Sequence, residues 1–426
     1  MLKRQRVLPF LTAVLGLSAA WFGTAVAGSG GSAYSILGIG DIRYAPGSRG
    51  AGMGYTGIGL APSLYINAAS PASWFRIDRT RLEGAALYEG FNSTDGARSR
   101  YLARLDFHGA LLAIPISPSD GLVLVGGFLP YSQVGYDTYT TGLYSRVGTD
   151  TVTMGYRLHH IGSGGITRAV LGASCAPAQA FSVGASLNYM FGTLSRSSEQ
   201  IPVQSGFSGG TFTSNQSISG LNFTTGVLVS TLGGITESLR PLSLGAVVTT
   251  RANLHTIDDV TYDYTFERDT SAAQYKRIGV PFSFGVGIGY QASERWTIAV
   301  DYTAQPWSES DFEGATPAGI RDSYRIGIGA ERAGSRESVA PWLDRLSYRL
   351  GFTFHQTYFN PGGHPVDEWA VTAGMAFPLS GESRLNVAAE YGSRGATEGG
   401  LIRDRIFRMT FSLNISDLWF VRYEED

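Results

Sequence analysis

Apolar and polar residues alternate with a period of two along most of the chain from Thr80 onward. This period places successive side chains on opposite faces of a β-strand. The alternating runs last about ten residues, whereas strands of soluble proteins have a mode of about 5–6 residues and a tilted membrane strand needs about 9–11. The pattern therefore predicts strands that cross a membrane.

The last alternating segment indicates which face each side chain takes. Its apolar positions include Phe407, Met409 and Phe411, and its polar positions include Arg408, Thr410 and Ser412. We predict that the apolar set faces lipid and the polar set faces the lumen, since a register shift of one residue would exchange the two faces.

Fourteen such strands are expected, an even number as in bacterial single-chain barrels. They lie near residues 80–91, 99–116, 121–137, 150–176, 180–196, 217–230, 241–256, 276–290, 295–305, 320–332, 345–358, 366–379, 383–392 and 402–416. The fourth has two interpretations, because Gly162-Ser163-Gly164-Gly165 is either a hairpin turn that divides it or a bend within one strand. We keep one strand, which preserves the even number.

The connections between these strands alternate in length. Residues 117–120, 176–179, 291–294 and 380–383 are short turns, whereas residues 138–149, 197–216, 257–275 and 306–319 are long. Membrane barrels have short periplasmic turns and long extracellular loops. The alternation therefore indicates which end of each strand is periplasmic and which is extracellular. Two connections assigned to the periplasm, 231–240 and 333–344, are longer than usual.

The segment 28–79 has no sustained alternation and is rich in glycine. Apolar residues such as Ile39, Met53 and Tyr65 make it too hydrophobic for a solvated tail. A disordered periplasmic leader is one interpretation. A compact plug inside the lumen accounts for both the glycine and the apolar residues, and we favour it.

The two ends of the chain have simpler patterns. Basic residues at Lys3, Arg4 and Arg6 precede the apolar stretch 7–22 and the triplet Ala25-Val26-Ala27. This order is typical of a secretory signal peptide, residues 1–27, that is cleaved after Ala27. The barrel then occupies residues 80–416, and residues 417–426 form a short periplasmic tail.

Composition supports a membrane barrel. Charged residues are 16% of the chain, against about 25% in soluble proteins. A closed barrel is the only β-structure that satisfies its backbone hydrogen bonds in lipid. The fold class is therefore an all-β, transmembrane, antiparallel barrel in a Gram-negative outer membrane. The net charge of −2 gives no electrostatic basis for binding nucleic acid.

The sequence contains no enzyme motif, so we expect neither a catalytic site nor a cofactor. His159 and His160 are adjacent and face opposite ways on a strand, which argues against a shared metal site. His255 lies near Asp258 and Asp259, whose spacing with Asp263 does not match a calcium-binding loop. A solvated polar loop is the simpler interpretation, and no metal site is predicted.

Two motifs in the N-terminal segment resemble a known family. The run from Arg49 to Leu60, RGAGMGYTGIGL, and the run from Asn67 to Ser73, NAASPAS, are similar to the hatch of the FadL-like transporters of hydrophobic compounds. The corresponding positions are Arg49, Gly52, Met53, Gly54, Asn67, Ser70, Pro71 and Ala72. Two positions depart from the family pattern: Tyr55 stands where a glycine is usual, and Asn67 is displaced from the Ser70-Pro71-Ala72 triplet.

This resemblance implies passive transport of a hydrophobic, fatty-acid-like small molecule that leaves sideways into outer-membrane lipid. The lateral opening is expected at a kink in the third strand, at Gly126, Gly127 and Pro130. Aromatic residues of the long loops would form the extracellular capture surface: Phe207, Phe212, Tyr262, Tyr264 and Phe266. The alternative function is a non-transporting barrel that acts as a partner or shuttle in protein secretion.

Overall fold

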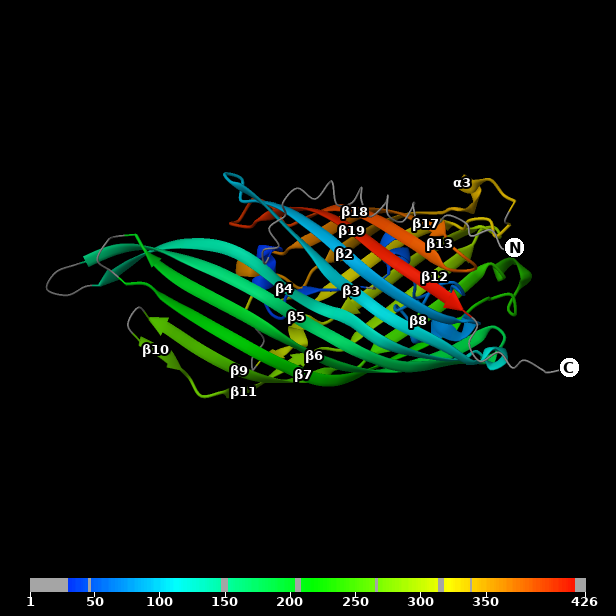
Figure 1. Ribbon diagram of the computed structural model, residues 1–426, viewed down its shortest axis with the longest axis horizontal. Coiled ribbons are helices and arrows are strands. Elements are labelled where there is room, and N and C mark those ends of the chain that lie inside the picture. Colours follow the sequence, from blue (N-terminus) through cyan, green and yellow to red (C-terminus); the bar gives the residue numbers. More distant parts are fainter. Residues whose placement is uncertain are drawn as a thin grey trace, which may run out of the picture.

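The computed structural model describes residues 30–44, 47–146, 152–203, 208–264, 267–312, 318–337 and 339–417. Their strands form one antiparallel sheet in which the last strand pairs with the first strand of the wall, so the sheet closes into a barrel (Figure 1). The expected signal peptide, residues 1–27, and residues 418–426 of the expected tail lie outside the described residues.

Fourteen wall strands are present in the described part of the chain, and the predicted all-β barrel is confirmed. Twelve are uninterrupted: β2 (Thr80–Thr94), β3 (Ser99–Ser117), β4 (Leu122–Arg146), β5 (Val152–Ala178), β6 (Phe181–Pro202), β7 (Gly210–Val229), β13 (Trp296–Gln305), β15 (Ser323–Arg332), β16 (Ser347–Gln356), β17 (Asp367–Pro378), β18 (Arg384–Arg394) and β19 (Arg403–Asp417). Two are interrupted: β8 (Leu242–Thr249) continues as β9 (Ala252–Tyr264), and β11 (Gln274–Val280) continues as β12 (Ser283–Gln291).

Short elements occupy the connections. The strands β10 (Glu267–Thr270) and β14 (Asp311–Phe312) extend the sheet locally, by pairing with β9 and β11. The turns contain η3 (Pro118–Asp120), η4 (Glu237–Leu239), η5 (Trp307–Glu309), α3 (Trp342–Arg345) and η6 (Pro361–Gly363). Among the described residues, no helix is both long enough and apolar enough to cross a membrane.

The fourth wall strand is continuous. β5 pairs with β4 and β6 on both sides of residues 162–165. Gly164 has a φ of 104°, and a Cβ there would lie 2.0 Å from the Thr193 carbonyl oxygen. The glycines therefore allow a close approach between strands, and the interpretation as one strand is confirmed.

The register of the final strand agrees with the prediction. Arg408, Thr410 and Ser412 are buried on the lumenal side, whereas Phe407 and Phe411 are 40% and 36% exposed on the outer side. Lipid-facing apolar residues and lumen-facing polar residues thus follow the alternation of the sequence.

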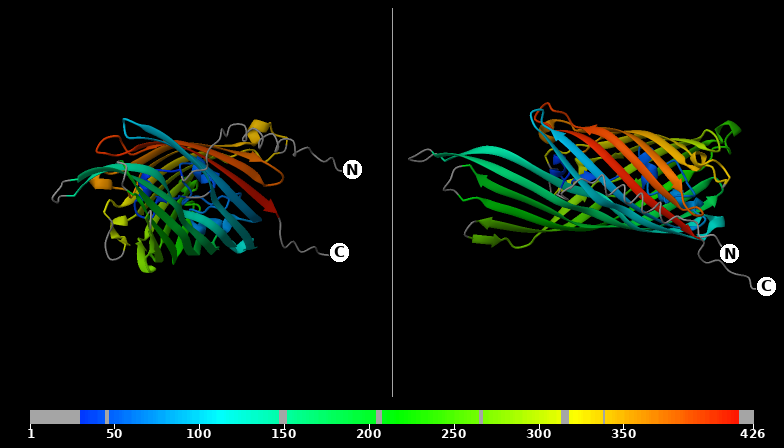
Figure 2. Two further views of the ribbon diagram at one scale, coloured as in Figure 1. Left: turned by 60° about the vertical axis from the view of Figure 1, so that its left-hand side comes forward. Right: turned by 45° about the horizontal axis from the view of Figure 1, so that its top comes forward.

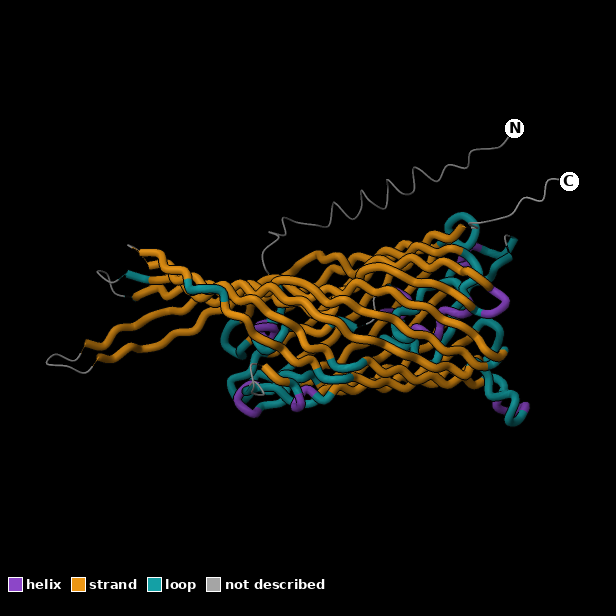
Figure 3. Tube along the Cα trace, turned by 90° about the horizontal axis from the view of Figure 1, so that it is seen from below, coloured by secondary structure: helices purple, strands orange, loops and turns teal. Residues whose placement is uncertain are grey.

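The barrel is strongly asymmetric, because one group of strands continues far beyond the others (Figures 1 and 3). β4, β5, β6 and β7 are 25, 27, 22 and 20 residues long. We call the projecting parts of β4–β7, β9 and β10 the extracellular sheet extension, which Figure 2 shows from two sides.

This extension corrects the predicted long loops at residues 138–149, 197–216 and 257–275. Much of each is strand, and β6 and β7 remain paired out to Gln200 and Gly210. The ladder continues because each further residue pair adds backbone hydrogen bonds, whether or not the strand is still in the membrane.

The N-terminal segment from Gly30 to Arg79 lies inside the barrel. It contains η1 (Ala33–Ile36), β1 (Asp41–Ile42), α2 (Ser48–Gly52) and η2 (Pro71–Arg76). α2 packs against β17 and β18, and η2 packs against β5, β6 and β7. The segment therefore touches opposite sides of the wall.

Candidate functional site

The ladder between β3 and β4 is incomplete. The two strands pair from Ser117 and Leu122 up to Ala110 and Phe128, and no pair between them follows in the described residues. Beyond that point β3 pairs with β2, while β4 pairs with β5 and, over two residues, with β1. The wall therefore has a gap in its hydrogen bonding on the extracellular side of Ala110.

Pro130 lies where this gap begins. The register between β4 and β5 shifts between Pro130 and Ser132, so Tyr131 is the extra residue of a β-bulge. Gly126 and Gly127 precede the bulge in the last paired stretch, where a Cβ on Gly127 would lie 2.1 Å from the Ala110 carbonyl oxygen. A proline suits this position because it has no backbone donor to leave unpaired.

The N-terminal segment covers the gap from inside. β1 pairs with β4 through Asp41–Gln133 and Ile42–Ser132, and the Arg43 amide donates to the Tyr131 carbonyl at 2.8 Å. Farther out, Gly30 lies against the Ala103 backbone of β3 and Gly31 against the Gly135 backbone of β4. This segment therefore substitutes for the missing contacts between the two strands.

A cavity of about 160 Å³ lies beside the gap. Its walls come from the N-terminal segment, from β3–β8 and from β12–β15, and they include Trp74, Leu111, Leu129, Tyr131, Val247 and Phe284. Because Leu111, Leu129 and Tyr131 flank the end of the β3–β4 ladder, the cavity reaches the part of the wall where backbone pairing stops. We call it the lumenal cavity.

The cavity wall is partly polar and carries four charged residues: Arg43, Arg168, Asp301 and Arg325. The Arg325 side chain is stacked over the rings of Tyr44 and Tyr55, with its guanidinium carbon 4.4 and 5.2 Å from their centroids. Its Nε and Nη1, like Nε of Arg168, are buried without a hydrogen-bond partner in the described residues. Both Arg168 and Arg325 line the cavity, so they bring positive charge to its wall.

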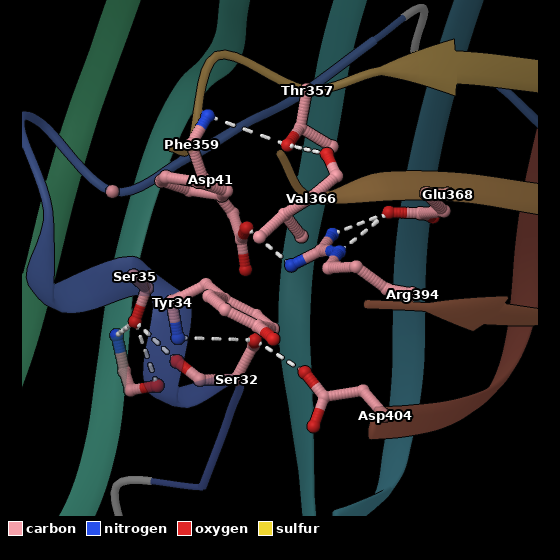
Figure 4. A network of polar contacts seen from close by, with 12 residues as sticks. Ser32, Tyr34, Ser35, Asp41, Thr357, Phe359, Val366, Glu368, Arg394 and Asp404 are labelled. Carbon is pink, nitrogen blue, oxygen red and sulfur yellow. Dashed lines mark hydrogen bonds and ion pairs between the residues drawn. The ribbon is translucent and has the colours of Figure 1, made fainter. Parts of the chain in front are cut away.

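An ion network ties the N-terminal segment to the wall on the other side of Tyr55. Arg43 forms two hydrogen bonds with Glu89, of 2.7 and 2.6 Å, and Arg104 and Arg408 bind the same carboxylate. Arg408 also binds Glu368 and Glu390, and Arg394 joins Glu368 to Asp41 (Figure 4). Arg104 also binds Asp106 at 2.8 Å, so the network holds four arginines and five carboxylates.

The hatch-like motif forms the contacts that fix the N-terminal segment. Arg49 binds Glu331 at 2.6 Å, the Gly54 amide donates to Thr372 Oγ1, and Gly52 lies against Gly374. The Asn67 side chain donates to the carbonyls of Gly57 and Leu60 at 2.7 and 3.1 Å. Met53 is fully buried, so these residues act in packing and positioning.

The triplet Ser70-Pro71-Ala72 begins η2. Pro71 is in its first turn, where the missing amide hydrogen is not needed. The Ser182 hydroxyl donates to the Ala72 carbonyl at 2.8 Å, which anchors η2 to β6. Trp74 Nε1–H donates a hydrogen bond of 2.7 Å to the backbone carbonyl of Asn67, so the displaced asparagine still contacts this helix.

Tyr55 has an unusual backbone conformation. Its φ is 64°, in the left-handed region that favours glycine, which is the residue usual there in the FadL-like pattern. Its hydroxyl donates to Glu390 at 2.5 Å. Burial raises the pKa of this phenol well above its usual value, and the Glu390 carboxylate adds to the shift. The phenol therefore stays protonated and remains a donor.

Three of the expected capture residues lie in the described part of the chain, and all three are strand residues, not loop residues. Phe212 of β7 and Tyr262 of β9 are paired, with ring centroids 5.3 Å apart, and Tyr264 follows on the same face of β9. Phe207 and Phe266 lie outside the described residues. The three described aromatics belong to the extracellular sheet extension rather than to the lumenal cavity.

The histidines form no metal site. His159 faces outward and binds Asp137 at 2.8 Å, whereas His160 contacts Ser198. Within the described ranges, no group of three or more His, Cys, Asp or Glu side chains could hold a metal ion.

Sequence reasoning missed Glu89, Arg168, Arg325, Glu368 and Arg408 as a group. The sequence did contain a signal. Each of these charged residues lies on the lumen-facing side of a strand whose opposite side is apolar. Alternation assigns such residues to the lumen but does not show which of them meet.

Comparison with known proteins places the chain in a family. The model of the family described as BamG matches residues 1–425. No curated protein sequence matches the chain.

Solved structures with the same fold confirm the FadL-like resemblance. The toluene transporter TbuX of Ralstonia pickettii has a TM-score of 0.56 at 14% identity, covering 87% of this chain and 98% of its own. A FadL homologue of Pseudomonas aeruginosa has a TM-score of 0.58 at 12% identity, covering 88% and 98%. The toluene transporter TodX of P. putida has a TM-score of 0.57 at 16% identity, covering 90% and 100%.

Proposed function

This chain belongs to the BamG family, and we propose that it carries compact hydrophobic molecules across the outer membrane, without catalysis, and releases them sideways into lipid. The observation that carries the proposal is the position of the lumenal cavity. It lies beside the one stretch of wall, among the described residues, where two neighbouring long strands part from each other.

The cavity volume supports a compact substrate. A cavity of roughly 150 Å³ with apolar walls holds one benzene-sized molecule, and the lumenal cavity measures about 160 Å³. A long fatty-acid chain needs more room than this. Transfer of an apolar molecule from water is favourable by roughly 25 cal/mol for each Å² of apolar area that is buried, so this pocket can capture its ligand without an energy source.

The two arginines support a polar or anionic group on that molecule. The unpaired nitrogens of Arg168 and Arg325 are buried, and a buried unpaired donor costs roughly 1–3 kcal/mol. A carboxylate or carbonyl oxygen in the cavity would offset the positive charge of these two side chains. A monoaromatic ring with one such group therefore fits the cavity better than a pure hydrocarbon.

Transport is tested with a substitution that places a large side chain in the lumenal cavity. Val247 lines it, whereas the next residue, Val248, is 47% exposed on the outer face of β8. Val247→Trp should reduce uptake of a radiolabelled monoaromatic carboxylate by whole cells at least about tenfold, the effect of 1.4 kcal/mol. Val248→Trp is the matched control and should transport normally at equal surface expression. Equal uptake by both variants would exclude the lumenal cavity from the route.

A role as a partner in protein secretion is the second candidate, and the extracellular sheet extension favours it. The extension presents β4 with an edge that pairs with no strand in the described residues beyond Asp137, and unpaired edges are templates for another chain. A partner that co-purifies stoichiometrically, and is lost when residues 138–160 are deleted, would support this role. An apolar ligand in the lipid extract would support transport.

A further inference from the structure

A second and larger cavity, of about 480 Å³, opens at the periplasmic end of the barrel. It lies between the N-terminal segment, the inner wall and the two long periplasmic connections, 231–240 and 333–344. Its lining includes Arg49, Arg76, Arg240, Arg336, Arg384 and a single acidic residue, Glu331. We call it the periplasmic vestibule.

The positive charge of this vestibule is only partly neutralised. Glu331 is shared by Arg49 and Arg349, at 2.6 and 2.7 Å, and Arg240 pairs with Glu237 of its own turn at 2.7 Å. No ion pair joins Arg76, Arg336 or Arg384 to a carboxylate in the described residues. The nearby Glu382 is already bound by Arg81 and Arg79.

Arg384 is a buried arginine without an ion-pair partner in the described part of the vestibule. Its side chain faces the lumen from the first residue of β18 and is only 7% exposed, yet its Nε and Nη1 have no hydrogen-bond partner among the described residues. A buried guanidinium normally forms a bidentate pair with a carboxylate or phosphate. No carboxylate among the described residues is paired with Arg384, so its positive charge remains available to an anion in the vestibule.

We propose that the periplasmic vestibule binds a phosphate group, carried by a phospholipid headgroup or by free phosphate. Phosphate suits the site because its negative charge is spread over terminal oxygens that the guanidinium groups of more than one arginine can share. The headgroup is the favoured source. Leu60, Leu64 and Leu228 line the same cavity, so apolar side chains lie beside the arginines, as a ligand with both a phosphate and acyl chains requires. This site is independent of the lumenal cavity.

The test measures binding to the full chain in an uncharged detergent by isothermal titration calorimetry. The probes are inorganic phosphate, dihexanoyl phosphatidic acid, and dihexanoylglycerol, which lacks the phosphate. We expect the first two probes to bind and the third not to bind. Tighter binding of phosphatidic acid identifies the headgroup as the ligand, whereas equal affinities identify free phosphate. Binding of dihexanoylglycerol as tight as that of phosphatidic acid, or of no probe, would overturn the proposal.

Variants locate the site. Arg384→Gln and Arg336→Gln should each weaken phosphatidic acid binding by about tenfold or more, as for the loss of a charge-assisted hydrogen bond. Arg336 is exposed, so its variant reports on binding even where Arg384→Gln impairs folding. Arg405→Gln, an exposed arginine at the opposite end of the wall, is the matched control. If Arg336→Gln binds as Arg405→Gln does, the vestibule is not the phosphate site.

Discussion

At the scale of single residues, the lumen is organised by buried charges and by one strained backbone position. Glu89 is fully buried and accepts hydrogen bonds from Arg43, Arg104 and Arg408. Tyr55 keeps a left-handed conformation that costs a non-glycine residue roughly 1–2 kcal/mol, and its ring supports Arg325 while its hydroxyl binds Glu390. These contacts offset the backbone strain, so a tyrosine is tolerated at a position where the FadL-like pattern usually has glycine.

Glu89→Gln should destabilise the barrel strongly. The change removes the charge that three buried arginines share, and a broken buried ion pair costs roughly 3–5 kcal/mol. The measurement is the temperature at which the protein loses its compact migration on a detergent gel. Glu398→Gln, an exposed change, is the control. Equal transition temperatures would mean that the network adds no stability.

At the scale of elements, the key feature is the exchange of partners along β4. Its inner part pairs with β3, but beyond the bulge at Tyr131 its free edge pairs with β1 of the N-terminal segment. β3 and β1 therefore pair with the same edge of β4 at successive positions, on either side of the bulge.

Pro130→Val should close part of the gap. Valine restores a backbone donor and favours strand geometry, so pairing between β3 and β4 should extend past Phe128. Uptake of the monoaromatic tracer should then fall several-fold while surface expression stays constant. Pro378→Val, at the end of β17, is the control because it lies away from the gap. Unchanged uptake in Pro130→Val would reject lateral release at this point.

At the scale of the whole molecule, the barrel wall and the N-terminal segment inside it are held together by different kinds of contact. The wall is closed by its own ladders, including that between β19 and β2, whereas the segment from Gly30 to Arg79 is attached through side chains and through the short strand β1. This division predicts that the wall can assemble without the segment.

Deletion of residues 28–74 should leave a barrel that still migrates as a heat-modifiable species but conducts ions in planar bilayers. The intact chain should be nearly silent, because the segment occupies the lumen. If both forms conduct equally, the segment does not block the pore. If the deleted form fails to assemble, the ion pairs of Arg43 and Arg49 are needed to neutralise Glu89 and Glu331 during folding.

The amino-acid sequence by itself determined the class of fold, the number of strands and, within each regular stretch of strand, the face of each side chain. These follow from local rules, since a period of two, the length of a membrane strand and the chemistry of lipid act on each segment separately. The hatch-like motif likewise marked the residues that fix the N-terminal segment.

Only the tertiary structure decided which lumenal residues meet. Arg43 and Arg408 are far apart in the sequence, yet they bind one carboxylate because closing the barrel brings β19 next to β2. Three further features depend on contacts between distant segments: the partner of β4 beyond Pro130, the partly neutralised arginines of the periplasmic vestibule, and the length of the extracellular sheet extension. Alternation assigns a side chain to the lumen, but the position of its partner is set by strand register and by the path of the N-terminal segment, which no local pattern encodes.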